Sequence, residues 1–299
     1  MNYFQRLQGS IEYIENNLSE EITLTDVARE SNCSLFHFHR LFHVIVGNSV
    51  KEYIRNRRLT LAAQDLVKTD TPVIDIAFDY QYGAPESFTR AFKKMYGLSP
   101  TEYRKWGAFA PLTEKANLLK VYYEELKKGI IMKPTIKVKK EFKVIGIELS
   151  TQHSSCQKDV PKFWKEISQE KSFQKIEGLK NPTEIYGICY GTCNGKCNDS
   201  AFSKNADDSD EFGYLICSEI DNFNNIPEGF VTRTMSKGKY ATFTIKGGFS
   251  EIQKGIETIY KNWLSNTSYE LAHSPHFEKY DDRWTGKEDS EMEIWIPIK

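Results

Sequence analysis

The sequence predicts a multidomain chain of two fold classes, an all-α N-terminal domain and an α+β C-terminal domain. An internal repeat with helical periodicity is confined to the first third of the chain, whereas apolar and polar residues alternate in the second half, as in β-strands. A chain of 299 residues is also long enough for about two hydrophobic cores. We expect domains at residues 1–107 and 132–299, joined by a helical linker at residues 108–131.

The composition is that of an ordinary globular protein. Hydrophobic residues make up 39% of the chain and charged residues 27%. The sequence contains no run of about 18 apolar residues that could span a membrane. Its first residues also lack the apolar segment of a signal peptide. We therefore expect a cytoplasmic protein that has no membrane partner.

Two copies of one helical unit occupy roughly residues 20–106. At an offset of 50 residues the copies share two phenylalanines and an arginine, which are Phe38, Arg40 and Phe42 in the first copy and Phe88, Arg90 and Phe92 in the second. Each copy predicts a helix, a turn and a second helix, with the turns at residues 31–34 and 82–85. A long helix from about Asn48 to Lys68 is expected to join the copies.

The second helix of each copy has an apolar face and a polar face. The apolar stripes are Phe38, Leu41, Phe42 and Ile45 in the first helix and Phe88, Ala91, Phe92 and Met95 in the second. The opposite faces are formed by Phe36, His39, Arg40 and His43, and by Glu86, Thr89, Arg90 and Lys93. Arginine can bond guanine bidentately, and threonine suits several base edges. Outward-facing arginines at matching positions predict two DNA-reading helices held about 34 Å apart, with solvated surface charges as the alternative.

Basic residues flank both second helices. They are Lys51, Arg55, Arg57 and Arg58 between the copies, and Lys93, Lys94, Arg104 and Lys105 in and after the second. Such residues contact phosphates and give affinity without sequence information. Because the formal net charge of the chain is -1, any basic surface must be local.

Residues 5–106 resemble the DNA-binding domain of the AraC/XylS family of transcription regulators. The resemblance is carried by Ile74-Asp75-Ile76-Ala77, Tyr82-Gly83, Ser87-Phe88-Thr89-Arg90-Ala91-Phe92-Lys93, Gly97-Leu98-Ser99-Pro100 and Tyr103-Arg104. It implies that two recognition helices enter successive major-groove segments of double-stranded promoter DNA, with base-reading candidates Phe36, His39, Arg40, Glu86, Ser87, Thr89 and Arg90. It also implies RNA polymerase as a partner and activation as the usual outcome. Tyr82 and Pro85 depart from the family pattern, and Glu86 leaves the base preference open.

The C-terminal half predicts the order strand, helix, strand, strand, twice over. The first set comprises strands at residues 135–150, 184–190 and 212–220 and a helix at 160–173; the second comprises strands at 239–246, 271–280 and 291–298 and a helix at 249–264. This duplicated order favours an α+β fold in which the helices cover a single face of one sheet.

The last strand carries different residues on its two faces, because side chains alternate along a strand. Met292, Ile294, Ile296 and Ile298 are expected to face the helices, and Glu291, Glu293, Trp295 and Pro297 the opposite side. A carboxylate among aromatic rings suits a lipophilic cation through charge and cation–π attraction. The sequence therefore predicts a ligand cleft around Glu293 on the helix-free face, with a solvated edge strand as the alternative.

Residues 132–299 resemble the gyrase-inhibitor-like effector domain that accompanies AraC-type DNA-binding domains and occurs in multidrug-sensing regulators. The similarity lies in the order of elements and in Asn262-Trp263-Leu264, His276-Phe277-Glu278-Lys279-Tyr280 and Glu293-Ile294-Trp295-Ile296-Pro297-Ile298. It implies a small, lipophilic and cationic effector, with Glu293 at the position of the buried glutamate that meets the cation. The weaker candidates for lining the site are Trp164, Tyr186, Tyr214 and Trp295.

Two other functions are consistent with parts of the sequence. Cys189, Cys193 and Cys197 recur every four residues, which favours free thiols over a common zinc site, with a metal- or redox-responsive loop as the alternative. Glu293 could also act as the base of a hydrolase, but the sequence has no nucleophile elbow, Gly-rich phosphate loop or H-E-x-x-H motif. We therefore expect a regulator with no catalytic residue, metal or cofactor.

Overall fold

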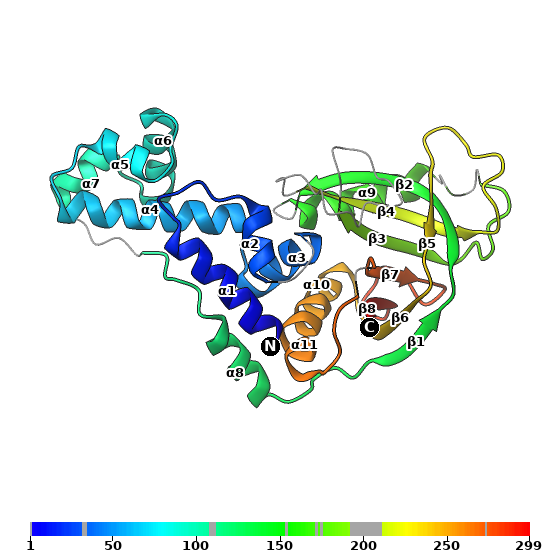
Figure 1. Ribbon diagram of the computed structural model, residues 1–299. Coiled ribbons are helices and arrows are strands. Elements are labelled where there is room, and N and C mark those ends of the chain that lie inside the picture. The colour runs from blue at the N-terminus through cyan, green and yellow to red at the C-terminus, as the bar shows by residue number, and fades with distance from the viewer. Residues whose placement is uncertain are drawn as a thin grey trace.

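The structure is a computed structural model that describes residues 2–31, 35–107, 112–152, 155–170, 173, 176–191, 211–272 and 274–299. Figure 1 shows a helical domain (blue and cyan) beside a domain of sheet and helices (green to red), joined by a linker with helix α8 (Leu118–Lys127). The prediction of a helical domain followed by a domain of sheet and helices is confirmed. None of the helices in the described segments is long and apolar enough to cross a membrane.

The helical domain contains two units of similar build. α1 (Tyr3–Asn16), α2 (Leu24–Glu30) and α3 (Leu35–Val46) form the first, α5 (Val73–Asp79), α6 (Pro85–Tyr96) and α7 (Pro100–Trp106) form the second, and α4 (Val50–Lys68) runs between them. The repeat sets how these helices end and begin. Gly47 after α3 and Gly97 after α6 take φ values of 87° and 78°, which stop each helix. Ser49 and Ser99 then cap α4 and α7 through matching capping boxes.

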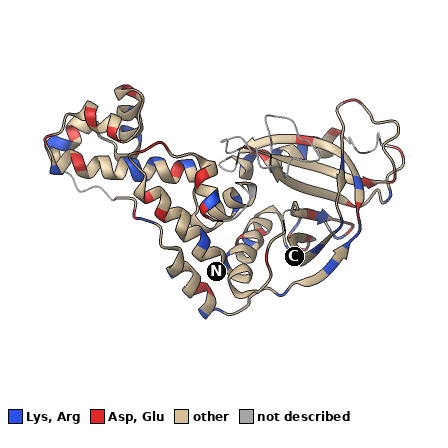
Figure 2. Ribbon diagram, viewed as in Figure 1, with Lys and Arg blue, Asp and Glu red and all other residues tan. Residues whose placement is uncertain are grey.

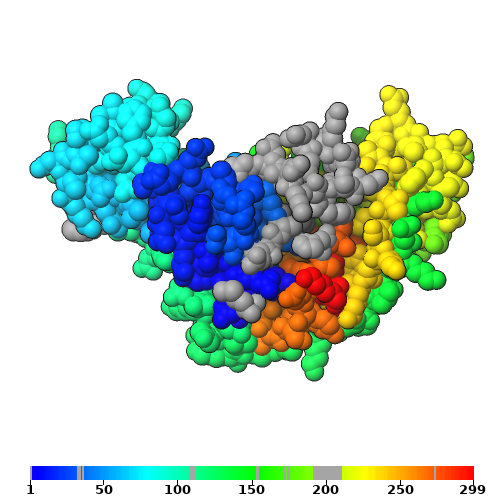
Figure 3. Space-filling view, in the orientation of Figure 1, coloured from blue at the N-terminus to red at the C-terminus, as the bar shows by residue number. Residues whose placement is uncertain are grey.

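Each unit has its own hydrophobic core. Phe38 and Phe42 of α3 are buried in the first core, where Phe42 meets Tyr53 of α4 at a ring distance of 5.6 Å. Phe88 and Phe92 of α6 are buried in the second. The apolar stripes predicted for both helices are therefore buried at these positions, and α4 is the long connecting helix. In Figure 3 the second unit (cyan) lies at one end of the molecule beside the first (dark blue), and the first lies against the rest of the chain.

The C-terminal domain is built on an antiparallel sheet with the strand order β1-β6-β8-β7-β3-β4-β2-β5. The strands are β1 (Thr135–Lys139), β2 (Phe142–Gln152), β3 (Ile185–Gly191), β4 (Glu211–Ile220), β5 (Val231–Met235), β6 (Gly238–Lys246), β7 (Phe277–Tyr280) and β8 (Glu291–Ile298). The helices are α9 (Cys156–Glu170) and α10 (Phe249–Thr258), and α10 continues through a π-helical turn, η2 (Ile259–Trp263), into α11 (Leu264–Asn266). The inward residues of β8, such as Ile294, belong to the cluster that includes these helices, and Trp295 belongs to an aromatic cluster on the other face.

The bounds of some strands differ from the sequence prediction, because they depend on pairing between segments that are distant in the sequence. The single strand predicted at residues 135–150 is two strands, because β1 pairs with β6 whereas β2 pairs with β4 and β5. β5 was not predicted. The strand predicted at residues 271–280 is reduced to β7, because Leu271 forms only an isolated bridge with Ile298.

The linker and α1 fasten the two domains together. The N–H of Ile131 donates to Asn262 Oδ1 at 2.9 Å, and the Asn262 amide donates to the Gly129 carbonyl at 2.9 Å. The N–H of Leu271 donates to the Tyr3 hydroxyl at 2.7 Å. With these contacts in place, α3 lies against η2 and β3 of the C-terminal domain.

Candidate functional site

A cleft of about 500 Å³ lies where the two domains meet. Residues of β3, β4 and β7 line it on the sheet side, residues of α9 and α10 line its flanks, and α3 of the helical domain closes it. Small-molecule sites typically measure roughly 300–1,000 Å³. The described lining residues include Arg40, His43, Val44, Val160, Trp164, Cys189, Tyr214, Ile252, Ile256, Glu278 and Tyr280.

Glu278 is the one carboxylate among the described lining residues, and it is 7% exposed. The hydroxyls of Tyr214 and Tyr280 donate to the same carboxylate oxygen, at 2.6 and 2.9 Å. Trp164 Nε1 in turn donates to the Tyr214 hydroxyl at 2.9 Å, so a chain of donors points toward the carboxylate. Burial raises the pKa of the Glu278 carboxyl, and the two tyrosine hydroxyls and Arg40 oppose this shift only in part.

Gly187 of β3 makes room for this chain of hydrogen bonds. It pairs with Glu278 across β3 and β7. A Cβ atom at this position would lie 2.2 Å from the Tyr214 hydroxyl oxygen and 2.8 Å from the Glu278 carboxylate. Because any side chain would displace one of these groups, the glycine is part of the architecture of the site.

Arg40 projects from α3 into the same cleft. Its guanidinium carbon lies 5.3 Å from the centroid of the Tyr260 ring of η2, a cation–π arrangement. Burial lowers the pKa of this guanidinium, but Tyr260, Cys189 and Glu278 raise it overall, so Arg40 keeps its charge. The cleft is therefore lined both by a cation of the helical domain and by the one described carboxylate among its lining residues.

The polar face of α6 lies on the surface. Glu86, Arg90 and Lys93 are exposed, and Thr89 is partly buried beside them. These four residues line a shallow depression together with Pro85 and Lys94. Ser87 is partly buried, and its hydroxyl donates to the Ala84 carbonyl at 2.6 Å within the first turn. The second unit thus presents the face that the sequence predicts for DNA.

The expectation of an equivalent outward face on α3 is wrong in this structure. His39 is buried, and Arg40 and His43 line the cleft instead of facing solvent. The side chain of Phe36 lies outside the described residues. The physical reason is that the C-terminal domain covers α3. The 12 residues of α3 include one permanently charged side chain, whereas the 12 residues of α6 include four. This difference between the two copies is the signal in the sequence that could have predicted the asymmetry.

Several basic residues expected at phosphates have structural partners instead. Arg57 forms an ion pair with Glu15 at 2.8 Å. Arg58 donates to the Leu18 carbonyl at 2.8 Å, and Arg104 donates to the Leu66 carbonyl at 3.0 Å. These arginines tie helices together and satisfy helix-end carbonyls. Figure 2 shows acidic and basic residues interspersed over both domains.

The ligand candidates fall on opposite faces of the sheet. Trp164 and Tyr214 line the cleft. Tyr186 and Trp295 lie in the aromatic cluster on the other face, where Trp295 stacks on Phe277 at a ring distance of 5.2 Å. Glu278 was not singled out from the sequence, although β7 alternation places it and Tyr280 on the same side.

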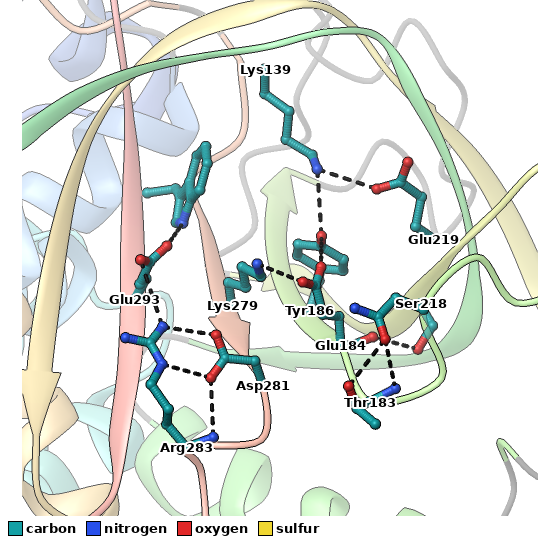
Figure 4. Close-up of polar contacts among 12 residues, drawn as sticks. Lys139, Thr183, Glu184, Tyr186, Ser218, Glu219, Lys279, Asp281, Arg283 and Glu293 are labelled. Atoms are coloured by element: carbon teal, nitrogen blue, oxygen red, sulfur yellow. Dashed lines mark hydrogen bonds and ion pairs between the residues drawn. The ribbon is translucent and has the colours of Figure 1, made fainter.

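Glu293 is engaged in a polar network outside the cleft lining. Its carboxylate pairs with Lys137 at 3.0 Å and accepts from Trp295 Nε1 at 2.9 Å. Arg283 approaches it at 3.7 Å. Burial raises the pKa of the Glu293 carboxyl, but Lys137 and Trp295 lower it overall. Figure 4 shows this network continuing through Arg283 to Asp281, so the charge of Glu293 is already matched.

The three cysteines for which the sequence favours free thiols are only partly described. Cys189 is buried and lines the cleft, and burial raises the pKa of its thiol to about 12. Cys193 and Cys197 lie outside the described residues. The choice between free thiols and a metal- or redox-responsive loop therefore stays a prediction.

A helical domain with two helix-turn-helix units, attached to a sheet domain beside a cleft of small-molecule size, is the architecture of a DNA-binding regulator that carries an effector domain. Residues 135–298 match the family described as integron-associated effector binding protein, and residues 27–105 match the helix-turn-helix domain family. The chain therefore belongs to the AraC family of regulators, with an effector-binding domain of the integron-associated, gyrase-inhibitor-like type.

The similar proteins cover the chain to different extents. The right origin-binding protein of Escherichia coli K12 is 26% identical over 303 residues and matches 96% of each chain. The uncharacterized HTH-type transcriptional regulator YbfP of Bacillus subtilis 168 is 49% identical over 104 residues. That match spans 35% of this chain and 35% of YbfP, about a third of that relative's length. The solved structure of SAV2435 bound to tetraphenylphosphonium has 21% identity and a TM-score of 0.46, covering 56% of this chain and 94% of that chain.

Proposed function

We propose that this protein is a transcription activator that binds promoter DNA through its two helix-turn-helix units and senses a lipophilic cation in the Glu278 cleft. The observation that carries the ligand class is a buried carboxylate surrounded by the aromatic side chains of Trp164, Tyr214 and Tyr280. Aromatic faces and a desolvated negative charge both attract a cation whose own surface is apolar. Glu278 takes the role that the sequence suggested for Glu293.

The polar lining of the cleft supports this choice. Burial raises the pKa of the Glu278 carboxyl, and the two tyrosine hydroxyls and Arg40 oppose this shift only in part. A cationic ligand would stabilise the charged form of Glu278, whereas a neutral ligand would not. A cation at about 5 Å from the carboxylate would gain about 3 kcal/mol at an effective dielectric constant of 20. That energy corresponds to a change of more than tenfold in affinity.

The test compares two ions of the same shape and opposite charge, tetraphenylphosphonium and tetraphenylborate, by isothermal titration calorimetry. We expect the phosphonium to bind the whole protein and the borate not to bind. Glu278→Gln should weaken phosphonium binding at least about tenfold. Glu293→Gln, the matched control on the other face, should change it less than about twofold. Equal binding of the two ions, or full affinity in Glu278→Gln, would reject a charge-based site.

For DNA, we propose that α6 reads bases through the exposed Arg90 with Glu86, Ser87 and Thr89, and that Lys93 contacts phosphate. The exposure of Glu86, Arg90 and Lys93 on the surface of α6, with Thr89 beside them, supports this part of the proposal. The corresponding residues of α3 are Phe36, His39 and Arg40, which would read DNA only after α3 leaves the C-terminal domain. Activation through contact with RNA polymerase, in the cytoplasm, completes the proposal. Reporter transcription with purified polymerase tests activation, and a signal that falls when the protein is added would contradict it.

A further inference from the structure

Arg40 is the side chain through which the helical domain enters the ligand cleft. Its guanidinium carbon lies 5.3 Å from the centre of the Tyr260 ring, in a cleft whose one described carboxylate is Glu278. An aromatic face and a buried carboxylate are the two groups that the proposed ligand would use. Arg40 therefore carries the charge of that ligand, contacts an aromatic ring and lines the same cleft as Glu278.

We propose that Arg40 is an internal occupant of the ligand cleft, which holds α3 away from DNA until a cationic ligand takes its place. The inference rests on the proposed function for the class of ligand and adds how that site controls DNA binding. Volume alone would admit both groups, because the cleft measures about 500 Å³ with Arg40 present. Electrostatic repulsion prevents Arg40 and a cationic ligand from occupying the cleft together, because both are attracted to the same carboxylate.

The contact that places Arg40 in the cleft also covers α3. Phe38 and Phe42 face the core of their own unit, while His37 and Val44 are buried on other sides of the helix. Every described side chain of α3 is buried or partly buried. A recognition helix must insert a free face into a major groove about 12 Å wide. In this conformation α6, with its exposed Arg90, can present such a face and α3 cannot.

The π-helical turn η2 connects the cleft to the linker between the domains. Tyr260 of η2 meets Arg40, and Asn262, two residues further on, holds the backbone of Gly129 and Ile131 by hydrogen bonds of 2.9 Å. Turns of this type recur at functional sites. Displacement of Arg40 therefore acts on the same short segment that anchors the linker.

The two binding events are then thermodynamically linked. A ligand that binds only when Arg40 has left the cleft favours the conformation in which α3 is free for DNA. Linkage requires the converse as well, so DNA must raise the affinity for the ligand by the same factor.

The first test measures DNA affinity by fluorescence anisotropy, with a labelled promoter fragment recovered by genome-wide footprinting. Glu278→Gln removes the charge that retains Arg40, so it should bind DNA at least about fivefold more tightly without any ligand. Tetraphenylphosphonium should raise the DNA affinity of the parent protein by at least about fivefold. Glu293→Gln should stay within about twofold of the parent. DNA binding by Glu278→Gln that equals or falls below that of the parent overturns the proposal.

The second test measures ligand affinity and does not depend on the fold of a Glu278 variant. Arg40→Gln removes the competing cation, so calorimetry should show tetraphenylphosphonium binding at least about fivefold more tightly. Arg29→Gln is the matched control, because Arg29 is an exposed arginine of the same domain whose charge pairs with Asp26 at 2.7 Å. It should change the affinity by less than about twofold. Unchanged or weaker binding in Arg40→Gln refutes internal competition.

The outcomes separate this inference from the proposed function. If tetraphenylphosphonium does not bind while Glu278→Gln still tightens DNA binding, the ligand class is wrong and the internal contact stands. If the cation binds, but neither it nor Glu278→Gln changes DNA affinity, the ligand site stands and control of α3 by Arg40 is refuted.

Discussion

Removal of the Tyr214 hydroxyl should destabilise the C-terminal domain more than removal of other buried tyrosine hydroxyls. This hydroxyl donates to Glu278 at 2.6 Å and accepts from Trp164 Nε1 at 2.9 Å. Tyr214→Phe deletes a hydrogen bond to a carboxylate, about 1.5–3 kcal/mol, and leaves a buried indole N–H without its acceptor, about 1–3 kcal/mol. Because neighbouring effects overlap, we expect a loss of roughly 3 kcal/mol in the free energy of unfolding. Tyr280→Phe deletes one such hydrogen bond, at 2.9 Å, and should cost about 1.5–2 kcal/mol.

Tyr240→Phe is the matched control for this comparison. The Tyr240 hydroxyl is buried on the other face of the sheet, with no hydrogen-bond partner among the described residues. Its removal should therefore change stability by less than about 0.5 kcal/mol or stabilise the protein slightly. Urea unfolding followed by tryptophan fluorescence and circular dichroism measures all three variants. A loss in Tyr214→Phe that is no larger than the loss in Tyr240→Phe would refute the chain of hydrogen bonds to Glu278.

Three further predictions concern DNA, pH and the helical domain. Arg90→Ala should weaken binding to the promoter fragment by about 1–3 kcal/mol in a gel-shift titration, with Arg29→Ala as the control; full affinity would mean that α6 does not read bases through Arg90. Because burial raises the pKa of the Glu278 carboxyl, its charge is lost as the pH falls through that raised value, so calorimetry should show phosphonium affinity decreasing from neutral toward acidic pH. An affinity independent of pH would contradict an ionised Glu278. Arg57→Ala should lower the free energy of unfolding of the helical domain by about 1.5–3 kcal/mol in urea unfolding, because the partly buried Glu15 loses its cationic partner while keeping the hydrogen bond from the Tyr53 hydroxyl. Unchanged stability together with a reduced salt dependence of DNA binding would restore Arg57 as a phosphate contact.

The helical domain was largely predictable because its determinants are local. Repeated residues such as Gly47 and Gly97, or Ser49 and Ser99, set helix ends within a few residues of themselves. The apolar stripe of each second helix can likewise be identified from spacing alone. The faces of β8 followed from alternation for the same reason.

The candidate ligand site was not predictable in this way, because its residues come from segments distant in sequence. Glu278 lies on the four-residue strand β7, its partner Tyr214 is on β4, and Trp164, which donates to Tyr214, is on α9. From the local sequence, Glu293 is the better candidate for the ligand carboxylate, since it shares a strand face with Trp295 on a longer strand. The two glutamates are distinguished by long-range partners, because Lys137 of β1 neutralises Glu293.

Arg40 and Arg90 show how a repeat can mislead. Both occupy the same position of the repeated unit, and sequence symmetry assigns both the same role. The symmetry is broken by a domain that contacts one copy only, since Arg40 meets Tyr260 while Arg90 stays exposed. Such a contact depends on the assembled tertiary structure, and the low charge of α3 relative to α6 is the feature of the sequence that indicates it.

The most direct measurement titrates tetraphenylphosphonium into the whole protein twice, once alone and once saturated with promoter DNA. If Arg40 and the ligand compete for Glu278, DNA that draws α3 out of the cleft should tighten phosphonium binding at least about fivefold. Identical affinities in the two titrations, or weaker binding with DNA present, would contradict the competition between α3 and the ligand.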